Sequence, residues 1–260
     1  MPFRQVGDLR LHSLESLNRP GLTHAAFTRL GGVSPTPWAS LNLGGTVGDD
    51  GPRVLENKRR ALEAVGRSGE SLHEVWQVHS ADVVHAQAPR GPAALRQADA
   101  MITSNPQVTL LMRFADCVPI LLYDPGKQAI GLVHAGWLGT ARKTVVQAVR
   151  ALRQAFGCDP AELLAGLGPS IGPDHYAVGE DVIGALRKAL GPSADEVLVA
   201  RNGQVHLDLW LANRRLLEGE GVTSIEVAEL CTACHLEDWY SHRGEAGKTG
   251  RFGALMALAA

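Results

Sequence analysis

The chain has 260 residues, of which 45% are hydrophobic and 20% are charged, and its formal net charge at pH 7 is −2. This composition is that of a globular protein that can bury a large core, and the near-balanced charge argues against a broad nucleic-acid surface or a polybasic membrane contact. Aromatic residues make up only 5% of the chain, so we expect no stacking platform for single-stranded nucleic acid.

The segment over residues 1–20 lacks the basic start and the apolar stretch of a secretory signal. No apolar run in the sequence reaches the length that a membrane-spanning helix needs. We therefore expect a cytoplasmic protein in which the four cysteines are reduced.

The first quarter of the chain predicts three elements, a hairpin over residues 3–12, a strand over 24–28 and a helix over 50–65. Two polar segments lie between the strand and the helix. Arg29 stands just before two glycines, in a loop that suits either an anion or a surface turn with a solvated arginine. Asn42 lies between two leucines, and a buried asparagine needs hydrogen-bond partners. It is therefore either a structural cap or a ligand contact.

Residues 74–86 predict a short strand, a break and a second strand. Gln77 lies in the first of these strands, and His79 lies at the break. A single histidine in such a place is more often part of a turn than a ligand, so His79 gains meaning only together with other residues.

Residues 109–140 predict two strands joined by an Asp-Pro-Gly turn. The first strand is interrupted by Asp116 and Cys117, and the second ends at His134, just before a glycine-rich loop. The hairpin brings Cys117 and His134 within reach of each other although they are 134 − 117 = 17 positions apart. They are either a nucleophile with its base or two metal ligands. A buried free thiol and a structural histidine remain the alternative.

The remaining chain predicts a helix over 140–156 capped by Thr140, a strand over 163–167, a helix over 182–190, a helix capped by Asp208, and strands over 222–227 and 252–258. Strands outnumber helices and do not alternate strictly with them. No internal repeat or long linker separates the elements. We therefore predict a single α+β domain over residues 1–260.

The segment from Cys231 to His235 has the C-x-x-C-H spacing of covalent haem attachment. Haem attachment belongs to exported proteins, and no signal segment was found. One cysteine pair can also form half of a zinc site, but no second pair in the sequence completes it. We expect a loop near the core without a metal.

Three residues of zinc-ligand type stand out, His79, Cys117 and His134. A catalytic zinc keeps three protein ligands and one open position for water or substrate, and two histidines with one cysteine suit it. His79 can join the other two only through the fold, because it lies 117 − 79 = 38 positions before Cys117.

The sequence resembles a known family through motifs that occur in order along nearly the whole chain. They are Thr28-Arg29-x-Gly-Gly-Val-Ser34, Ser40-Leu-Asn42-Leu-Gly44, Gln77-Val-His79-Ser, Ala98-Asp99-Ala100, Ala115-Asp116-Cys117-Val-Pro119, His134-Ala-Gly136-Trp137-x-Gly139, Gly168-Pro-x-Ile-Gly172, Cys231-Thr232 and Thr249-Gly-Arg251. The family is the multicopper-polyphenol-oxidase-like, laccase-domain group. Its members are usually described as purine nucleoside phosphorylases and also as a peptidoglycan editing factor family.

The resemblance implies a four-layer α/β/β/α fold with mixed sheets and a zinc held by His79, Cys117 and His134. It also implies phosphorolysis of adenosine, inosine and methylthioadenosine, with adenosine deamination as a second reaction. The expected partners are thus small-molecule purine nucleosides and phosphate, rather than nucleic acid or a membrane. We expect a monomer or a small homo-oligomer.

Within this hypothesis Asp116 is the candidate proton shuttle, or else a carboxylate that orients a histidine. The candidate phosphate binders are Arg29, Arg243 and Arg251. Asn42 and Gln77 are candidate contacts to the sugar or base. Two departures from the family pattern affect these roles, because Leu138 stands where the family has arginine and the loop over 241–245 differs.

Other functions use the same residues. Cys117 as nucleophile and His134 as base would make a hydrolase that edits peptidoglycan precursors carrying the wrong amino acid. A copper-dependent phenol oxidase ranks lower, because the ten histidines are scattered and form no H-x-H pair. A binding module without enzymatic activity ranks last, since it would leave an open three-ligand site unused.

Overall fold

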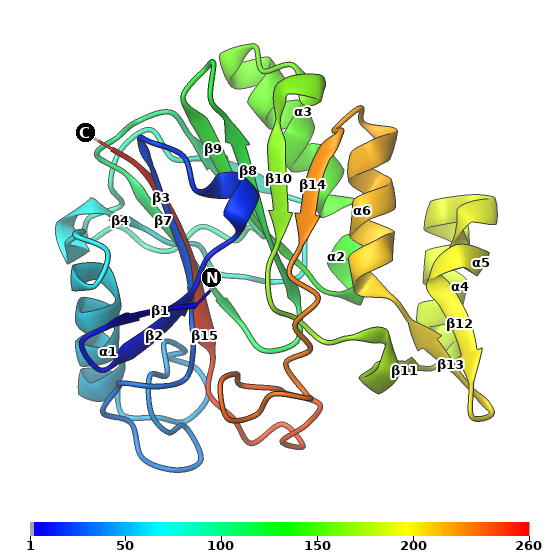
Figure 1. Ribbon diagram of the computed structural model, residues 1–260, viewed down its shortest axis with the longest axis horizontal. Coiled ribbons are helices and arrows are strands. Elements are labelled where there is room, and N and C mark those ends of the chain that lie inside the picture. The colour runs from blue at the N-terminus through cyan, green and yellow to red at the C-terminus, as the bar shows by residue number, and fades with distance from the viewer. Residues whose placement is uncertain (1–2, 260) are drawn as a thin grey trace.

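Two six-stranded sheets pack face to face at the centre of the molecule, and helices cover their outer faces (Figure 1). The computed structural model describes residues 3–259, so residues 1–2 and 260, the ends of the domain predicted over 1–260, lie outside the described residues. One apolar core lies between the sheets, a second between one sheet and α1, and a third between the other sheet and the remaining long helices. This arrangement confirms the expected four-layer α/β/β/α fold.

The first sheet has the strand order β1-β2-β3-β15-β7-β4. The strands are β1 (Phe3–Val6), β2 (Leu9–His12), β3 (Leu22–Phe27), β15 (Phe252–Leu258), β7 (Thr109–Phe114) and β4 (Leu72–His73). All neighbours are antiparallel except β4 and β7, so the sheet is mixed as expected.

The second sheet has the order β14-β10-β8-β9-β6-β5, with parallel pairs at both edges. Its strands are β14 (Ser224–Val227), β10 (Leu164–Leu167), β8 (Val118–Asp124), β9 (Ala129–Ala135), β6 (Ala100–Thr103) and β5 (Val83–His85). The helices are α1 (Gly51–Glu63), α2 (Trp137–Ala141), α3 (Thr144–Phe156), α4 (Glu180–Leu190), α5 (Ala194–Val197) and α6 (Leu209–Gly219).

Strands β8, β9 and β15 are buried along their whole length. Because both faces of each strand are covered, their sequences read as nearly continuous apolar runs. The predicted turn between β8 and β9 is confirmed, and the Asp124 Oδ1 accepts hydrogen bonds from the N–H groups of Gly126 and Lys127, each at 2.9 Å. This hairpin has the longest paired register of the second sheet, from the pair Val118 and Ala135 to the pair Asp124 and Ala129.

The prediction that residues 109–123 form one interrupted strand is wrong. Strand β7 belongs to the first sheet and β8 to the second, and residues 115–117 carry the chain from one sheet to the other. Asp116 has a φ of +83°, which lies in the left-handed region and is incompatible with an extended strand. The polar interruption in the sequence therefore marks a change of sheet.

Two further boundaries differ from the sequence prediction. The helix expected over 140–156 is divided into α2 and α3, because Lys143 between them has a φ of +59°. Thr140 lies inside α2 and its hydroxyl accepts a hydrogen bond from Asn213 instead of capping a helix. The strand expected over residues 75–78 does not form, because β4 (Leu72–His73) ends before it and Trp76 makes only an isolated bridge to Gln97.

A small third sheet was not predicted. It has the order β11-β13-β12 and packs with α4 and α5 at one end of the molecule (Figure 1). Its strands are β11 (Ala177–Val178), β13 (Gln204–Leu207) and β12 (Leu198–Arg201). The two longer strands are mostly exposed along residues 198–204, so they lack the apolar pattern that marks a strand in a sequence.

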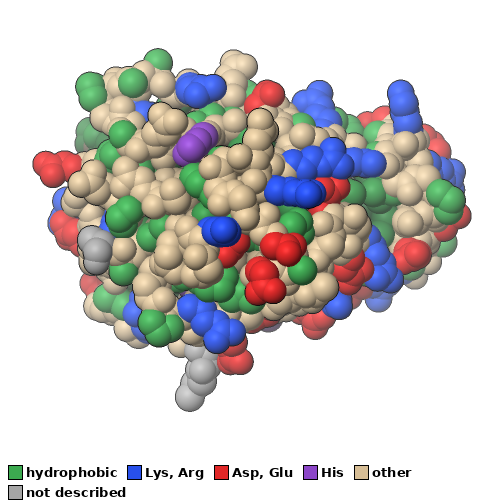
Figure 2. All heavy atoms as spheres, turned by 90° about the horizontal axis from the view of Figure 1, so that it is seen from above, with side chains coloured by type: hydrophobic (Ala, Val, Ile, Leu, Met, Phe, Trp, Pro, Cys, Tyr) green, Lys and Arg blue, Asp and Glu red, His purple; other side chains and the backbone are tan. Residues whose placement is uncertain are grey.

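Among the described helices, none combines the length and apolar character that crossing a membrane requires. Figure 2 shows one face of the molecule, on which basic and acidic side chains are interspersed and neither sign covers the whole face. This mixed distribution agrees with the near-zero net charge.

Two buried histidines in the first sheet make folding sensitive to acid. Burial, only partly offset by Glu226, lowers the pKa of His12 and of His24 to about 4. The unfolded chain binds these protons near the ordinary pKa of ~6.5, so the unfolded state holds more protons below that pH. The stabilising effect is complete above the unfolded pKa and is lost as the pH falls from 6.5 towards 4.

We expect the substitution His24→Gln to flatten this pH dependence. The N–H of Leu14 donates to His24 Nε2 at 3.0 Å, and a glutamine oxygen can accept the same bond. From pH 7 to pH 5 the wild type should lose roughly 2 kcal/mol of unfolding free energy through His24, and the variant should lose that much less. Urea unfolding at pH 7 and at pH 5 measures this change in the free energy of unfolding. The control is His85→Gln, because His85 is exposed. An unchanged pH dependence in His24→Gln would contradict the assignment.

Candidate metal centre and cavity

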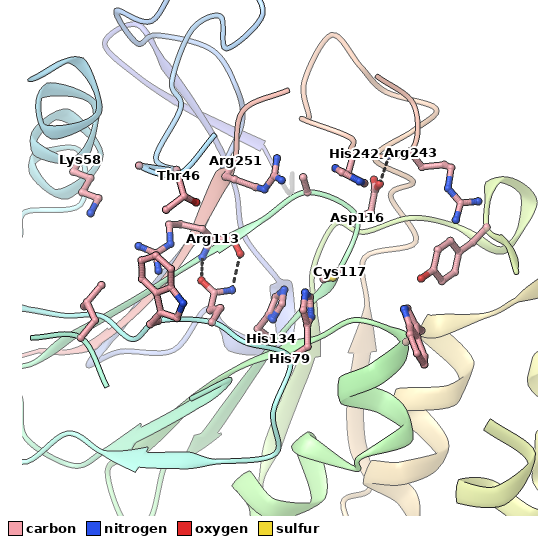
Figure 3. Close-up of a pocket in the computed structure, with 18 residues that line it drawn as sticks. Thr46, Lys58, His79, Arg113, Asp116, Cys117, His134, His242, Arg243 and Arg251 are labelled. Carbon is pink, nitrogen blue, oxygen red and sulfur yellow. Dashed lines mark hydrogen bonds between the residues drawn. The ribbon is translucent and has the colours of Figure 1, made fainter. Parts of the chain in front are cut away.

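A cavity of about 790 Å³ lies where the chain passes between the sheets (Figure 3). Residues from both halves of the chain line it. They include Gly44, Gly45, Thr46, Lys58, Trp76, Gln77, His79, Arg113, Asp116, Cys117, His134, Trp137, Tyr176, His242, Arg243 and Arg251. The cavity thus combines possible metal ligands, positive charges and aromatic rings.

The three predicted metal ligands meet in this cavity. Their ligand atoms all lie within 4.8 Å of one another, and Figure 3 shows the three side chains side by side. Cys117 precedes β8 and His134 lies near the end of β9, opposite Pro119. The antiparallel pairing therefore brings these two together as the sequence indicated, and His79 reaches them from a loop.

Asp99 holds both histidines in place. Its Oδ1 lies 2.8 Å from His134 Nδ1, and its main-chain carbonyl accepts the N–H of the same residue at 2.8 Å. Its Oδ2 accepts the N–H groups of Val78 and Ser80, on either side of His79, at 3.1 and 2.6 Å. Asp99 is fully buried. A carboxylate that fixes the ring orientation of a ligating histidine is usual in metal sites.

The electrostatics of the group favour a bound cation. Burial opposes charge on His134, but the Cys117 thiolate and the Asp99 carboxylate raise its pKa. Burial likewise opposes the charge on Asp99, yet the hydrogen bonds from His134 and from the backbone lower its pKa. Burial and the neighbouring His134 lower the pKa of His79. A buried carboxylate beside two imidazoles and a cysteine sulfur is a donor set that attracts a metal ion.

The side chains present fit a zinc ion. A thiolate and two imidazoles are ligands that Zn²⁺ accepts, and three of them leave one position open. Because Nδ1 of His134 faces Asp99, Nε2 is the nitrogen left for a metal.

Local backbone geometry crowds the three side chains together. His79 and Asp116 both have positive φ angles, +57° and +83°, and such conformations in non-glycine residues cluster at functional sites. Gly136 follows β9, and a Cβ there would lie 2.5 Å from the Cys117 Sγ and 3.8 Å from His79 Nδ1. The position next to the thiol thus has no room for a side chain.

Asp116 lines the cavity and is buried, with three hydrogen bonds on its carboxylate. Oδ1 accepts the hydroxyls of Thr232 and Ser241 at 2.7 and 2.6 Å, and Oδ2 accepts the N–H of Arg243 at 2.6 Å. It anchors the loops over 231–235 and 241–245 to the cavity. The histidine-orienting role that was one of its two predicted roles is filled by Asp99.

Positive side chains gather on the other side of the cavity (Figure 3). Lys58 and Arg113 both pair with the buried Glu74, at 2.9 and 3.2 Å. Arg251 lines the cavity with its guanidinium close enough to Cys117 and Asp116 for both to act on its pKa, which burial lowers. Arg243 lies over the Tyr176 ring, 5.0 Å from its centroid. Lys58, Arg113 and Arg251 make a positively charged wall, whereas Arg243 lies at the other end of the cavity, beside Asp116.

Two predicted substrate contacts lie outside the cavity. Arg29 donates to the carbonyls of Ala39 and Leu236 and to Glu245. Asn42 is fully buried, and its Oδ1 accepts the N–H groups of Gly44 and Arg251. Each therefore holds loops around the cavity, and Asn42 fixes the backbone of Arg251.

The remaining predicted contacts are in the cavity. Gln77 lines it, but its amide exchanges two hydrogen bonds with the backbone of Arg113, at 2.8 and 3.0 Å. Arg243 and Arg251 line it as well. Leu138, where the family pattern has arginine, is not among the lining residues, and nearby Arg142 donates to the His79 carbonyl at 2.6 Å.

Sequence reasoning missed several residues of the site. Asp99 was noted only as part of a motif, and Lys58, Arg113 and the aromatic residues Trp76, Trp137 and Tyr176 were not singled out. A sequence feature could have identified Asp99, since a carboxylate directly before a buried strand is unusual enough to suggest a functional role. Lys58 lies on α1 among five other charged side chains, so nothing in the sequence separates it from them.

The four-layer fold and the Cys-His-His group at the crossing between its sheets define an α/β protein with a candidate metal centre. A family model described as "Multi-copper polyphenol oxidoreductase laccase" matches residues 23–259. The chain belongs to this laccase-like family, which confirms the resemblance carried by the motifs.

Relatives and solved structures cover almost the whole chain. The protein named purine nucleoside phosphorylase of Deinococcus radiodurans is 41% identical over 251 residues, 94% of this chain and 93% of that protein. The protein named purine nucleoside phosphorylase YfiH of Escherichia coli is 32% identical over 238 residues, which are 92% of this chain and 94% of that protein. The crystal structure of YlmD from Geobacillus stearothermophilus matches with a TM-score of 0.93 at 33% identity, over 100% of this chain and 99% of that chain.

We expect Gly136→Ala to impair metal binding while the fold is kept. The backbone of Gly136 (φ −83°, ψ −173°) is extended, which alanine adopts freely, so the contact with Cys117 Sγ is the main cost. Metal titration of the reduced protein should show affinity reduced by at least tenfold, with a circular dichroism spectrum like that of the wild type.

The matched control is Gly184→Ala, because a Cβ at this position in α4 meets nothing within 4 Å. It should bind metal as the wild type does and gain up to ~1 kcal/mol of stability from helix propensity. Unchanged metal affinity in Gly136→Ala would show that Cys117 is not a ligand in the arrangement described.

Proposed function

We propose that this chain is a zinc-dependent purine nucleoside phosphorylase that acts on adenosine, inosine and methylthioadenosine and also deaminates adenosine. The relatives' names support the nucleoside phosphorylase class. The observation that carries the proposal is one cavity in which the three candidate ligands lie beside a positively charged wall and three aromatic side chains.

His79, Cys117 and His134 would hold the zinc. A bound Zn²⁺ would supply Lewis-acid activation of a water or of a substrate oxygen. The chain's own contribution is orientation, since Asp99 fixes the ring of His134 and the loop of His79. Copper is the less favoured ion, because phenol oxidation by copper relies on clustered histidines and the cavity contains only His79, His134 and His242.

In phosphorolysis a phosphate oxygen bonds to the anomeric carbon of ribose as the bond from that carbon to the purine nitrogen breaks. The products are ribose 1-phosphate and the free base. Lys58, Arg113 and Arg251 are suited to bind the phosphate and to orient it, because charge-assisted hydrogen bonds to phosphate are the strong ones. Arg243 at the exposed rim is a further candidate.

The purine base needs a flat, apolar contact, and Trp76, Trp137 and Tyr176 provide aromatic faces in the cavity. Stacking of a base on an aromatic side chain contributes ~1–3 kcal/mol. Gln77 has both ends of its amide occupied by Arg113, so we give it the role of holding that arginine.

In deamination, water adds to the purine carbon that carries the amino group and ammonia leaves, so protons must move from the water to the nitrogen. Asp116 is suited to carry them. An ionised carboxylate offers about four acceptor positions, and the three hydrogen bonds leave one on Oδ2, which accepts only the N–H of Arg243. That position is free for a proton from the cavity.

A second candidate function uses Cys117 and His134 as a catalytic pair instead of as metal ligands. The Cys117 sulfur and a ring nitrogen of His134 lie within 4.8 Å of each other, which suits a nucleophile and its base. The alternative is therefore a hydrolase with Cys117 as nucleophile, acting on a peptidoglycan precursor that carries a wrong amino acid. Such an enzyme would work in metal-free protein and would be inactivated by alkylation of one thiol.

The deciding experiment combines metal analysis with product assays on adenosine, with and without phosphate. Adenine formed only with phosphate, in protein that contains zinc, is the expected result, and inosine formed regardless of phosphate would demonstrate the deaminase. Cys117→Ala should lose both the metal in the cavity and the activity. Full activity in this variant would refute the assignment, and thiol-dependent hydrolysis without metal would favour the alternative.

We expect Lys58→Gln to weaken phosphate binding selectively. Removal of a charge-assisted hydrogen bond costs ~1.5–3 kcal/mol, so the KM for phosphate should rise by about tenfold or more while the KM for the nucleoside changes little. Steady-state kinetics with each substrate varied in turn measures both values.

The control is Lys188→Gln, an exposed lysine on α4 that does not line the cavity. It should leave both KM values unchanged. If Lys58→Gln raises the two KM values equally, the lysine supports the shape of the cavity through Glu74 and does not bind phosphate.

A further inference from the structure

A second group of metal-ligating side chains lies outside the cavity-lining set. The ligand atoms of His175, Cys231 and Cys234 all lie within 4.8 Å of one another. The two cysteines are the C-x-x-C turn for which the sequence predicted a loop without a metal, because no second pair completes a zinc site. His175 supplies that ligand from 231 − 175 = 56 positions earlier.

The backbone fixes both segments of this group. Cys231 forms a parallel bridge with Ser170, and its carbonyl accepts the N–H of Cys234 at 3.2 Å, which closes the turn. His175 ends a short 3-10 helix, Pro173–His175, in which its N–H donates to the Gly172 carbonyl at 3.1 Å. Ser170 and Gly172 belong to the same glycine loop, so that loop fixes the turn and the histidine relative to each other.

The two nitrogen–sulfur distances match those of tetrahedral coordination. His175 Nδ1 lies 3.7 Å from Cys231 Sγ and 3.5 Å from Cys234 Sγ. With Zn–S bonds of about 2.3 Å and Zn–N bonds of about 2.0 Å at tetrahedral angles, nitrogen and sulfur ligands lie roughly 3.6 Å apart. A single nitrogen therefore faces both thiols at the separation that a shared ion requires.

The surroundings suit a thiolate ligand with access from solvent. The N–H of Gly172 donates to Cys231 Sγ at 3.2 Å, and hydrogen bonds of this kind orient and stabilise metal ligands. A Cβ at Gly172 would lie 3.1 Å from the Trp210 ring and 3.2 Å from the Cys231 Cβ, so the glycine lets Cys231 pack closely. Cys231 is buried, whereas His175 and Cys234 are exposed, which leaves the fourth position open to water.

We propose that His175, Cys231 and Cys234 form a second binding site for a thiophilic divalent cation, with Zn²⁺ as the best match to two thiolates and one imidazole. This site is separate from the Cys117 group and does not rest on the function proposed above.

The second site is structural, because it joins two segments that shape the cavity. Tyr176 follows His175 and lines the cavity. Thr232 follows Cys231, and its hydroxyl donates to Asp116 at 2.7 Å. A cation here would fix both segments in register beside the cavity.

The test is Zn²⁺ titration of reduced, metal-free protein after the free thiols have been counted. The wild type should bind two ions per chain, whereas Cys117→Ala and Cys234→Ser should each bind one. Cys234 is exposed, so its substitution should not disturb folding. The control is His235→Ala, because His235 is an exposed neighbour whose Nδ1 contacts Glu237 instead, and it should bind two ions.

A second measurement isolates the new site. In Cys117→Ala, Zn²⁺ at a hundredfold excess over its dissociation constant should raise the melting temperature by roughly 5 °C. The double variant Cys117→Ala/Cys234→Ser should show no such shift. The proposal is overturned if Cys234→Ser binds as many ions as the wild type, or if protein with four free thiols takes up only the ion that Cys117→Ala removes.

Discussion

The buried carboxylate of Asp99 is the constraint on which the rest of the site depends. It contacts His134 directly, and it accepts the two backbone N–H groups that flank His79. One side chain therefore sets the ring of a buried histidine and the loop of an exposed one. A buried carboxylate would be costly without partners, and three hydrogen bonds provide them. The same bonds that make its burial acceptable bring the two imidazoles to Cys117.

The parts of the fold that were predictable from the sequence are those that local chemistry determines. The β8–β9 hairpin has a turn whose aspartate bonds its own backbone and strands that are apolar throughout, so both the turn and the pairing were correct. The passage of the chain between sheets at residues 115–117 was not predictable, because an interrupted strand and two strands in different sheets leave the same apolar pattern. Lys143 divides α2 from α3 because its φ is left-handed. A lysine in the sequence gives no sign of such a backbone conformation.

The candidate site divides in the same way. Cys117 and His134 were paired by the hairpin, whereas His79 needed the fold or the family resemblance to join them. Arg29 and Asn42 looked like ligand contacts because polar residues near glycines or among leucines need partners. The structure gives them protein partners. Tertiary contacts decide which hydrogen-bond partner a buried polar group finds. A sequence can therefore show that a polar side chain needs a partner without showing which group supplies it.

The cavity has a buried floor and a solvent-exposed edge. Its floor is built from β8, β9 and the crossing between the sheets, which are buried and bonded on both sides. Its edge is built from side chains on exposed loops, including Trp76, His242 and Arg243. Substitutions at the edge cost little folding energy, since they touch solvent instead of the core. Such an architecture separates the evolution of substrate choice from that of the reactive centre: in the altered loop over 241–245 the exposed side chains of His242 and Arg243 can diverge while the buried Ser241 stays bonded to Asp116.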